Sequence, residues 1–210
     1  MSAILFYDCE TTGVPKKGVP AGSPVHPHIC QLAAQLVADG RVVAEFNFLV
    51  KPQNWGVPKE AEAVHGISTE MCEQFGLPIR TVITCLIRLA QRASLGVAHQ
   101  REFDNLLVWT ELIRCELATE LAFWLEFPGF CTMEASTPIL QIPPTQRMIA
   151  AGFNKFKNPN LKEAYAFFTN GGTFDGAHDA AADVSACRKV YEGILAWQAK
   201  QANQPLNLDE

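Results

Sequence analysis

The chain lacks the two kinds of segment that direct proteins into or across membranes. None of its apolar runs is long enough to span a bilayer, and its N-terminus has no basic region followed by an apolar one. The first absence argues against a membrane-spanning protein, and the second argues against a secretory signal peptide. We therefore expect a cytoplasmic protein with no membrane partner.

Paired cysteines are also missing from the sequence. The seven cysteines are an odd number, they are scattered from Cys9 to Cys187, and no two of them form a C-x-x-C motif. This distribution argues against a zinc site and against a framework of disulfide bonds. It fits the reducing conditions of the cytoplasm.

Basic residues are few for a protein that wraps around nucleic acid. Lysine and arginine number 17 against 22 acidic residues, which gives a formal net charge of −5. Extended nucleic-acid-binding surfaces are usually basic, so the composition disfavours them. A protein that grips only the end of a strand needs few phosphate contacts, and bound divalent cations would offset part of the acidic charge, so this class stays open.

The remaining composition is typical of a soluble globular domain, with 48% hydrophobic and 19% charged residues. We find no repeat, no low-complexity tract and no linker long enough to divide the chain. The sequence therefore predicts one domain over residues 1–200 and a flexible polar tail over residues 201–210.

Hydrophobic patterning predicts strands first, and then helices alternating with short strands. An apolar strand at 3–7 and a hairpin of 29–38 and 42–50 around Asp39-Gly40 predict three antiparallel strands. Residues 138–160 are rich in proline and are predicted to be irregular. The expected fold is an α/β mixed sheet flanked by helices. The predicted helices are 59–65, 69–76, 78–90, 102–117, 119–127, 160–170 and 179–200, and the further strands are 95–98 and 130–133.

The first candidate site follows the first strand. Asp8 and Glu10 are two residues apart, so both carboxylates project from one face of the strand, and Thr11-Thr12-Gly13 turns the chain away. Paired carboxylates repel each other, and hard oxygen ligands of this kind favour Mg²⁺ or Mn²⁺. Taken alone, the pair is equally consistent with two solvated acids at a strand end.

Two further segments place a carboxylate where a core element meets a loop. Asp104 follows the strand at 95–98 and lies in the first turn of the next helix, where the helix dipole alone would also favour an acid. His178 and Asp183 are five residues apart, so they reach one point only if His178 precedes the helix. The alternative is that Asp179 caps the helix and Asp183 is an ordinary acid of its first turn.

The three segments indicate more together than any of them alone. Four carboxylates and one histidine are the groups that two-metal phosphoryl chemistry needs, because two divalent cations hold the attacking and leaving oxygens of an in-line displacement. A neutral histidine near its unperturbed pKa can take the proton of the attacking water.

Four motifs follow one another in a characteristic order. They are Asp8-x-Glu10-Thr-Thr-Gly, Val57-Pro58-x-x-Ala61-x-x-x-His65-Gly66-Ile67, His99-x-x-x-Phe103-Asp104 and His178-x-Ala180-x-x-Asp183. In this order they resemble the DEDDh exonucleases, the DnaQ-like family that includes the proofreading subunit of bacterial replicative DNA polymerase. The resemblance spans residues 4 to about 195.

The resemblance implies a ribonuclease H-like fold whose five-stranded mixed sheet begins with three antiparallel strands. It implies 3′→5′ hydrolysis at nucleic-acid 3′ ends with release of nucleoside 5′-monophosphates. The cofactors would be two Mg²⁺ (or Mn²⁺) ions, and His178 would be the general base. The implied metal ligands, which would act with His178 in catalysis, are Asp8, Glu10, Asp104 and Asp183.

The same resemblance implies a site for the terminal nucleotide. Its backbone contacts would come from Thr11, Thr12 and Gly13, and its side-chain contacts from His65 and Phe103. Phe103 suits sequence-tolerant stacking on a base, but a core phenylalanine at a helix start explains it equally well. His65 could likewise do no more than end a helix.

Substrate and partner remain open between several alternatives. We expect single-stranded DNA or frayed 3′ ends, with RNA ends as the second choice. A free-standing enzyme is expected rather than a proofreading subunit, and the complete ligand set argues against a non-catalytic binding module. One position departs from the family: Gln100 replaces the asparagine that usually follows the motif histidine, which alters the geometry of any hydrogen bond made there.

Two weaker patterns also have two interpretations each. Lys155, Lys157 and Lys162, with Phe156 among them, either contact phosphates upstream of the scissile bond or form a solvated loop. Residues 204–209 faintly resemble the peptide by which bacterial replication proteins bind the sliding clamp, which would add a replication-protein contact.

Overall fold

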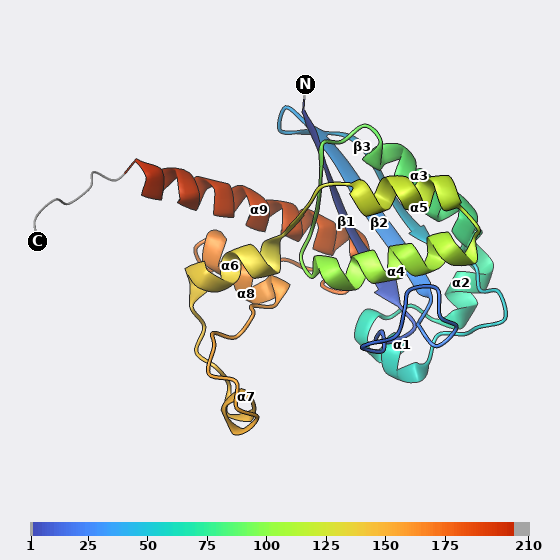
Figure 1. The fold of residues 1–210 in the computed structure, drawn as a ribbon, viewed down its shortest axis with the longest axis horizontal. Coiled ribbons are helices and arrows are strands. Elements are labelled where there is room, and N and C mark those ends of the chain that lie inside the picture. Colours follow the sequence, from blue (N-terminus) through green and yellow to red (C-terminus); the bar gives the residue numbers. More distant parts are fainter. Residues whose placement is uncertain (1, 204–210) are drawn as a thin grey trace, which may run out of the picture.

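The computed structural model describes residues 2–203. A five-stranded sheet lies at its centre, in the order β3-β2-β1-β4-β5 (Figure 1). Strand β2 is antiparallel to both β1 and β3, whereas β4 pairs with β1, and β5 with β4, in parallel. The mixed sheet predicted from the sequence is confirmed. The strands are β1 Ala3–Thr11, β2 Ile29–Ala38, β3 Arg41–Leu49, β4 Leu95–Ala98 and β5 Gly129–Cys131.

Alternation along β1 sends its side chains into two different layers. Leu5 and Tyr7 are buried in the core that the sheet forms with α3 (Ile79–Ala90), α4 (Arg101–Arg114) and α5 (Ala118–Glu126). Phe6 points to the opposite face, where it packs on α9 (Ala180–Ala202). Asp8 and Glu10 have the parity of Phe6, so they lie on the α9 face of the sheet.

Helix α9 is anchored over its N-terminal part, as far as Ile194. Val184 and Tyr191 pack on the sheet, and Tyr191 makes an edge-to-face contact with Phe6. Farther along the helix, Ile194 packs on Ala164 of α8 (Leu161–Phe168). These contacts fix the first turn of α9 beside β1, and Figure 1 shows the far end of the helix extending away from the sheet.

Local signals account for the short helices that follow the hairpin. Helix α1 (Lys59–His65) ends at Gly66, which adopts a left-handed φ of 74° and donates its N–H to the Glu62 carbonyl. Helix α2 (Thr69–Phe75) begins at Ser68, whose side chain accepts the Met71 N–H. Both helices have the bounds that the sequence predicts to within one residue.

The sequence prediction is wrong for residues 132–140 and 146–150, which are helical, whereas the rest of the segment predicted to be irregular, up to residue 160, contains no helix or strand. The strand ends at Cys131, and Thr132–Leu140 forms helix α6 although Pro138 lies inside it. The helix is tied to the core by its buried Thr132 and Ser136, and it ends two residues after the proline. A second short helix, α7 (Gln146–Ala150), is capped by the Thr145 side chain. Pro138 therefore does not exclude helix α6, which continues for two residues beyond it.

Residues 141–160 form an arm between α6 and α8. Figure 1 shows the part of this arm around α7 hanging below the body of the molecule. The two sides of its base are joined by the Lys157 N–H, which donates to the Ile142 carbonyl at 2.9 Å. At its end, Asn160 and Glu163 form the capping box that the sequence predicts for α8.

Within residues 2–203, no helix is both long and apolar enough to cross a bilayer. The clamp-like peptide at 204–209 lies outside the described residues, as does most of the predicted tail.

Candidate active site

Strand β1 supplies two carboxylates to one side of the sheet. Asp8 pairs with Ala33 of β2, and Glu10 pairs with Gln31. Both acids are half-buried, while their neighbours Cys9 and Thr11 are buried on the other face. The strand continues to Thr11, and its pairing with β2 shifts register only between Glu10 and Thr11, so both acids stand on the strand rather than in a loop. Their directions are therefore fixed by the sheet.

Asp104 approaches the same region from the first turn of α4. It is only 3% exposed. Its Oδ1 accepts the Cys9 N–H at 3.3 Å and the Cys9 thiol at 3.2 Å. Cys9 lies between Asp8 and Glu10, so these bonds join the third predicted carboxylate directly to the strand that bears the first two.

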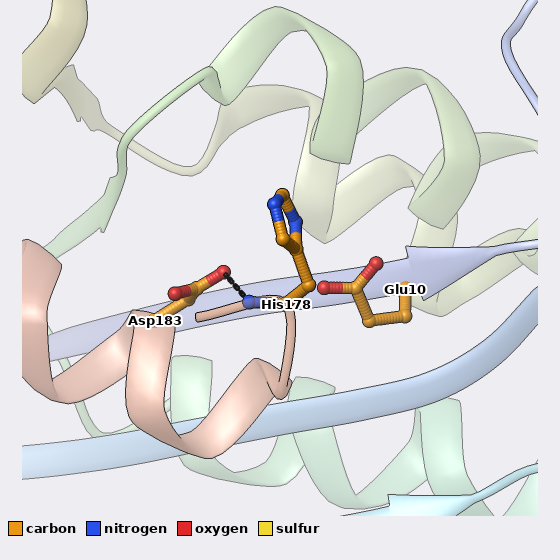
Figure 2. Close-up of side chains that lie close together, drawn as sticks. All are labelled: Glu10, His178 and Asp183. Atoms are coloured by element: carbon orange, nitrogen blue, oxygen red, sulfur yellow. Dashed lines mark hydrogen bonds between the residues drawn. The ribbon is translucent and has the colours of Figure 1, made fainter. Parts of the chain in front are cut away.

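The beginning of α9 supplies the remaining two groups. Asp179 caps the helix by accepting the N–H groups of Ala181 and Ala182, and Asp183 lies in the first turn. His178 precedes the helix with a left-handed φ of 71°. Its backbone N–H donates to Asp183 Oδ2 at 3.1 Å (Figure 2). The two alternatives that the sequence left open are therefore compatible. Asp179 caps the helix, and His178 and Asp183 nevertheless reach one point.

Three predicted groups converge closely. One potential ligand atom from each of Glu10, His178 and Asp183 lies within 4.8 Å of the others. Figure 2 shows Glu10 on β1, Asp183 in the first turn of α9 and His178 in the loop that leads into α9. Among residues 2–203, Asp8 and Asp104 fall outside this tight group, although both are close enough to repel its carboxylates.

Burial and mutual repulsion disfavour the charged forms of these acids. Burial raises the pKa of Glu10 to about 8, and repulsion from Asp183 and Asp104 adds to the rise. Burial likewise raises the pKa of Asp104 to about 7 despite the hydrogen bonds from Cys9. The pKa of Asp8 is raised well above its usual range by burial and then by Asp104. Such a cluster becomes fully ionised at neutral pH only when a cation compensates it.

The donor set fits a hard divalent cation. Asp183 Oδ1 is buried and accepts no hydrogen bond from the described residues. A buried carboxylate oxygen without a donor is costly unless it binds an ion. With the neighbouring carboxylates it offers the oxygen-rich surroundings that Mg²⁺ and Mn²⁺ prefer.

These pKa shifts predict how the stability of the metal-free protein depends on pH. The folded state retains protons that the unfolded chain releases, because each folded-state pKa is the higher one. Between the unfolded Glu10 pKa of 4.5 and its folded value of about 8, the free energy of unfolding should therefore fall as pH rises. Adding Mg²⁺, which binds the ionised form, should raise Tm more at pH 8 than at pH 6. Calorimetry at both pH values would contradict this account if the Mg²⁺ shift were equal or larger at pH 6.

The turn after β1 is held by its own side chains. Thr11 Oγ1 donates to the Gly13 carbonyl at 2.7 Å, and Thr12 Oγ1 accepts the His28 N–H at 2.9 Å. The hydroxyl groups are therefore engaged in shaping the turn. Contacts with a nucleotide from Thr11, Thr12 and Gly13 would come from the backbone, as the sequence predicts.

His65 lies against this turn. Its Nδ1 accepts the Ile67 N–H at 3.1 Å, which leaves the proton on Nε2, and Nε2 donates to the Thr11 carbonyl at 3.3 Å. Burial lowers the pKa of His65, which favours the neutral form of the ring. Both nitrogens serve the protein itself, so any contact of His65 with a nucleotide would use the face or edge of the ring.

Phe103 is half-buried at the start of α4. Part of its ring packs on the core, and the remainder lines a cavity of about 620 Å³ together with the loop that carries Lys16 and Lys17. Gln100 and Met133 line the same cavity. The two interpretations of Phe103 are therefore compatible, because a core-anchored ring presents a fixed surface to this space.

His99 has a structural environment at the end of β4. It is 8% exposed, and its ring nitrogens lie 2.9 Å from Thr132 Oγ1 and 3.1 Å from the Pro159 carbonyl. Burial lowers its pKa to about 4. This motif histidine therefore joins β4, α6 and the end of the arm. The neighbouring Gln100 begins α4 without a side-chain cap.

Sequence reasoning missed two groups of positioning residues. Gln31 is buried opposite Glu10; it donates to Asp179 Oδ2 at 3.2 Å and accepts the Ala180 N–H at 3.0 Å, which fixes the start of α9. Arg114, paired with buried Glu111 at 2.7 Å, donates to three carbonyls of the loop at 14–28. Gln31 and Arg114 each form hydrogen bonds with residues that are distant in the sequence, so no local motif marks them.

Gln31→Leu should loosen the start of α9 and so displace His178 and Asp183. The substitution removes two hydrogen bonds and leaves buried polar partners, so we expect a loss of about 1–3 kcal/mol in the free energy of unfolding, together with reduced activity. Gln35→Leu is the matched control, since Gln35 is on the same strand but bonds exposed partners. Urea unfolding of both variants tests this, and equal destabilisation would contradict the assigned role.

The strand order and the acidic side chains converging from β1, α4 and α9 define a ribonuclease H-like protein. The family model RNase T, described as exonuclease, matches residues 5–191. The chain belongs to this exonuclease family, which confirms the resemblance that the motifs suggested. The comparison with curated protein sequences gave no match.

Solved structures of exonuclease I share the fold. Escherichia coli exonuclease I in complex with a dT13 oligonucleotide has a TM-score of 0.70 and 17% identity over 96% of this chain and 42% of its own. The zinc-bound complex of the same enzyme with single-stranded DNA has a TM-score of 0.67 and 17% identity over 97% and 42%. Exonuclease I from Methylocaldum szegediense has a TM-score of 0.64 and 20% identity over 98% and 42%. The chain thus spans less than half the length of these proteins.

Proposed function

We propose that this protein is a 3′→5′ exonuclease that uses two divalent metal ions and acts on single-stranded DNA ends. The observation that carries the proposal is the convergence of Glu10, Asp183 and His178 within 4.8 Å, beside Asp8 and Asp104. The fold likeness to exonuclease I supports DNA as substrate, because those structures contain DNA oligonucleotides.

The proposed reaction cleaves the bond between the terminal phosphorus and the 3′ oxygen of the preceding nucleotide. Water attacks the phosphorus, the new oxygen–phosphorus bond forms, and the old 3′ oxygen leaves and takes up a proton from the solvent. The products are a nucleoside 5′-monophosphate and a strand with a new 3′-hydroxyl group. When bound, two Mg²⁺ or Mn²⁺ ions would stabilise the charge on the attacking and leaving oxygens.

The chain itself would supply the ligands, the base and the nucleotide site. Asp8, Glu10, Asp104 and Asp183 are the proposed ligands, held by a strand and two helix starts. A ring nitrogen of His178 takes the proton of the attacking water; the side chain is exposed, so it reaches solvent, while its backbone is tied to Asp183.

Matched oligonucleotides test this proposal. A 5′-labelled single-stranded DNA should shorten stepwise from its 3′ end in Mg²⁺, and a 3′-labelled strand should release label as a mononucleotide at once. A circular single strand of the same sequence is the control, and cutting it as fast as the linear strand would contradict an exonuclease. Faster degradation of the matched RNA would replace DNA by RNA as the substrate.

A further inference from the structure

The arm at residues 141–160 differs in charge from the rest of the molecule. Residues 141–162 contain four basic residues and no acidic one. The whole chain has a net charge of −5, of which this segment contributes +4, leaving −9 for the remainder. A segment of this length without a single acid, in a chain with 22 of them, is a local basic surface. The four are Arg147, Lys155, Lys157 and Lys162.

These cations are largely free to bind anions. Lys157 pairs with Glu163, but among the ion pairs of residues 2–203 none involves Arg147, Lys155 or Lys162. All three are exposed. They are therefore available to the phosphates of a nucleic acid.

Exposed aromatic rings lie among the cations. Phe153 is 64% exposed and Phe156 is 46% exposed, and they flank Lys155 in the sequence. Neither ring belongs to a core cluster of the described residues. Alternating rings and cations form the surface that single-stranded nucleic acid recognises, because bases stack on the rings and phosphates meet the cations.

The base of the arm lies beside the candidate active site. The Pro159 carbonyl contacts the ring of His99, five residues before Asp104. The Lys162 ammonium is close enough to the Asp183 carboxylate for their charges to interact. The basic residues therefore begin next to the carboxylates and continue outward along the arm.

Two cavities between Phe103 and the arm share one lining residue. The cavity of about 620 Å³ beside Phe103 has Glu134 in its wall, and a second cavity of about 520 Å³, bounded by Lys155 and Phe156, shares that residue. Glu134 is exposed. The two spaces are thus neighbours, and the acid between them would repel a passing phosphate.

We propose that the arm binds the single-stranded substrate several nucleotides upstream of its 3′ end, with bases stacked on Phe153 and Phe156 and phosphates held by Arg147 and Lys155. This rests on the proposed function, since it assumes that the 3′ end lies at the carboxylate cluster. The arm would raise the affinity for strands long enough to reach it.

A comparison of long and minimal substrates tests the arm separately from the active site. Thymidine 5′-monophosphate p-nitrophenyl ester reports on the carboxylate cluster alone, and a 12-nucleotide single strand reports on both. Phe153→Ala/Phe156→Ala should lower the kcat/KM ratio of 12-mer to ester by about 5- to 150-fold for each stacking contact that is lost. Lys51→Ala/Phe75→Ala, an exposed cation and ring beside α2, is the matched control with an unchanged ratio.

The salt dependence of binding distinguishes phosphate contacts of the cations from base stacking on the rings. Arg147→Ala/Lys155→Ala should reduce the slope of log binding constant against log salt by about 1.4, or 0.7 for each lost phosphate contact, whereas Glu134→Gln should tighten binding. The proposal would be overturned if Phe153→Ala/Phe156→Ala left the 12-mer to ester ratio unchanged and Arg147→Ala/Lys155→Ala left the salt slope unchanged. The arm would then be a surface for a protein partner instead. If the wild-type protein hydrolysed neither substrate, the proposed function itself would be contradicted.

Discussion

Asp8→Asn is expected to abolish metal-dependent nucleotide release while stabilising the metal-free protein. Asp8 carries one of the carboxylates that burial and repulsion make costly to ionise. The amide keeps the shape of the side chain but removes its charge, so the remaining acids repel less. Lewis-acid stabilisation contributes several kcal/mol to such reactions, so we expect kcat to fall by about 10³-fold or more.

The combination of opposite effects distinguishes this explanation from simple misfolding. A misfolded variant loses activity and stability together, whereas Asp8→Asn should raise Tm in EDTA and lose the Mg²⁺-induced rise. Asp39→Asn is the control, because Asp39 is exposed in the β2–β3 turn and asparagine tolerates its φ of 50°. Retained activity in Asp8→Asn, or a lowered Tm in EDTA, would contradict the assignment.

His178→Asn should reduce kcat by about 10²- to 10⁴-fold, the usual range for loss of a general base. Asparagine suits this position because His178 has a left-handed φ of 71°, which asparagine adopts more readily than alanine. The backbone N–H that donates to Asp183 Oδ2 is retained. The variant thus removes the imidazole and little else.

Metal binding distinguishes the loss of the general base from the loss of a metal ligand. In His178→Asn, the Mg²⁺-induced rise in Tm at pH 8 should stay close to that of the wild type, whereas in Asp8→Asn it should vanish. A His178→Asn protein with wild-type kcat at saturating substrate would show that another group accepts the proton.

The sequence predicts the site well where its geometry follows from short-range rules. The two-residue spacing of Asp8 and Glu10 fixes their common face, because side chains alternate along a strand. The capping preference of Asp179 fixes where α9 begins, and this leaves His178 outside the helix. These rules depend only on neighbouring residues, so one sequence suffices to apply them.

The sequence does not reveal contacts between distant segments. Gln31 and Asp179 are 148 residues apart, so nothing local marks Gln31 as the residue that holds the start of α9. Helix α6 was missed for a different reason: Pro138 reads as a helix breaker, whereas tertiary contacts of Thr132 and Ser136 outweigh that preference. The prolines of the arm likewise predict an irregular segment. That this segment projects from the body of the molecule is visible only in the structure (Figure 1).

The most direct test of the central claim is the number of Mn²⁺ ions that the carboxylates bind. Free Mn²⁺ measured by electron paramagnetic resonance, at pH 8 and with thymidine 5′-monophosphate present, gives this number without any turnover. The account predicts saturable binding of two ions per wild-type chain and a loss of binding in Asp8→Asn, with His178→Asn close to the wild type. Equal Mn²⁺ uptake by the wild type and Asp8→Asn would contradict it.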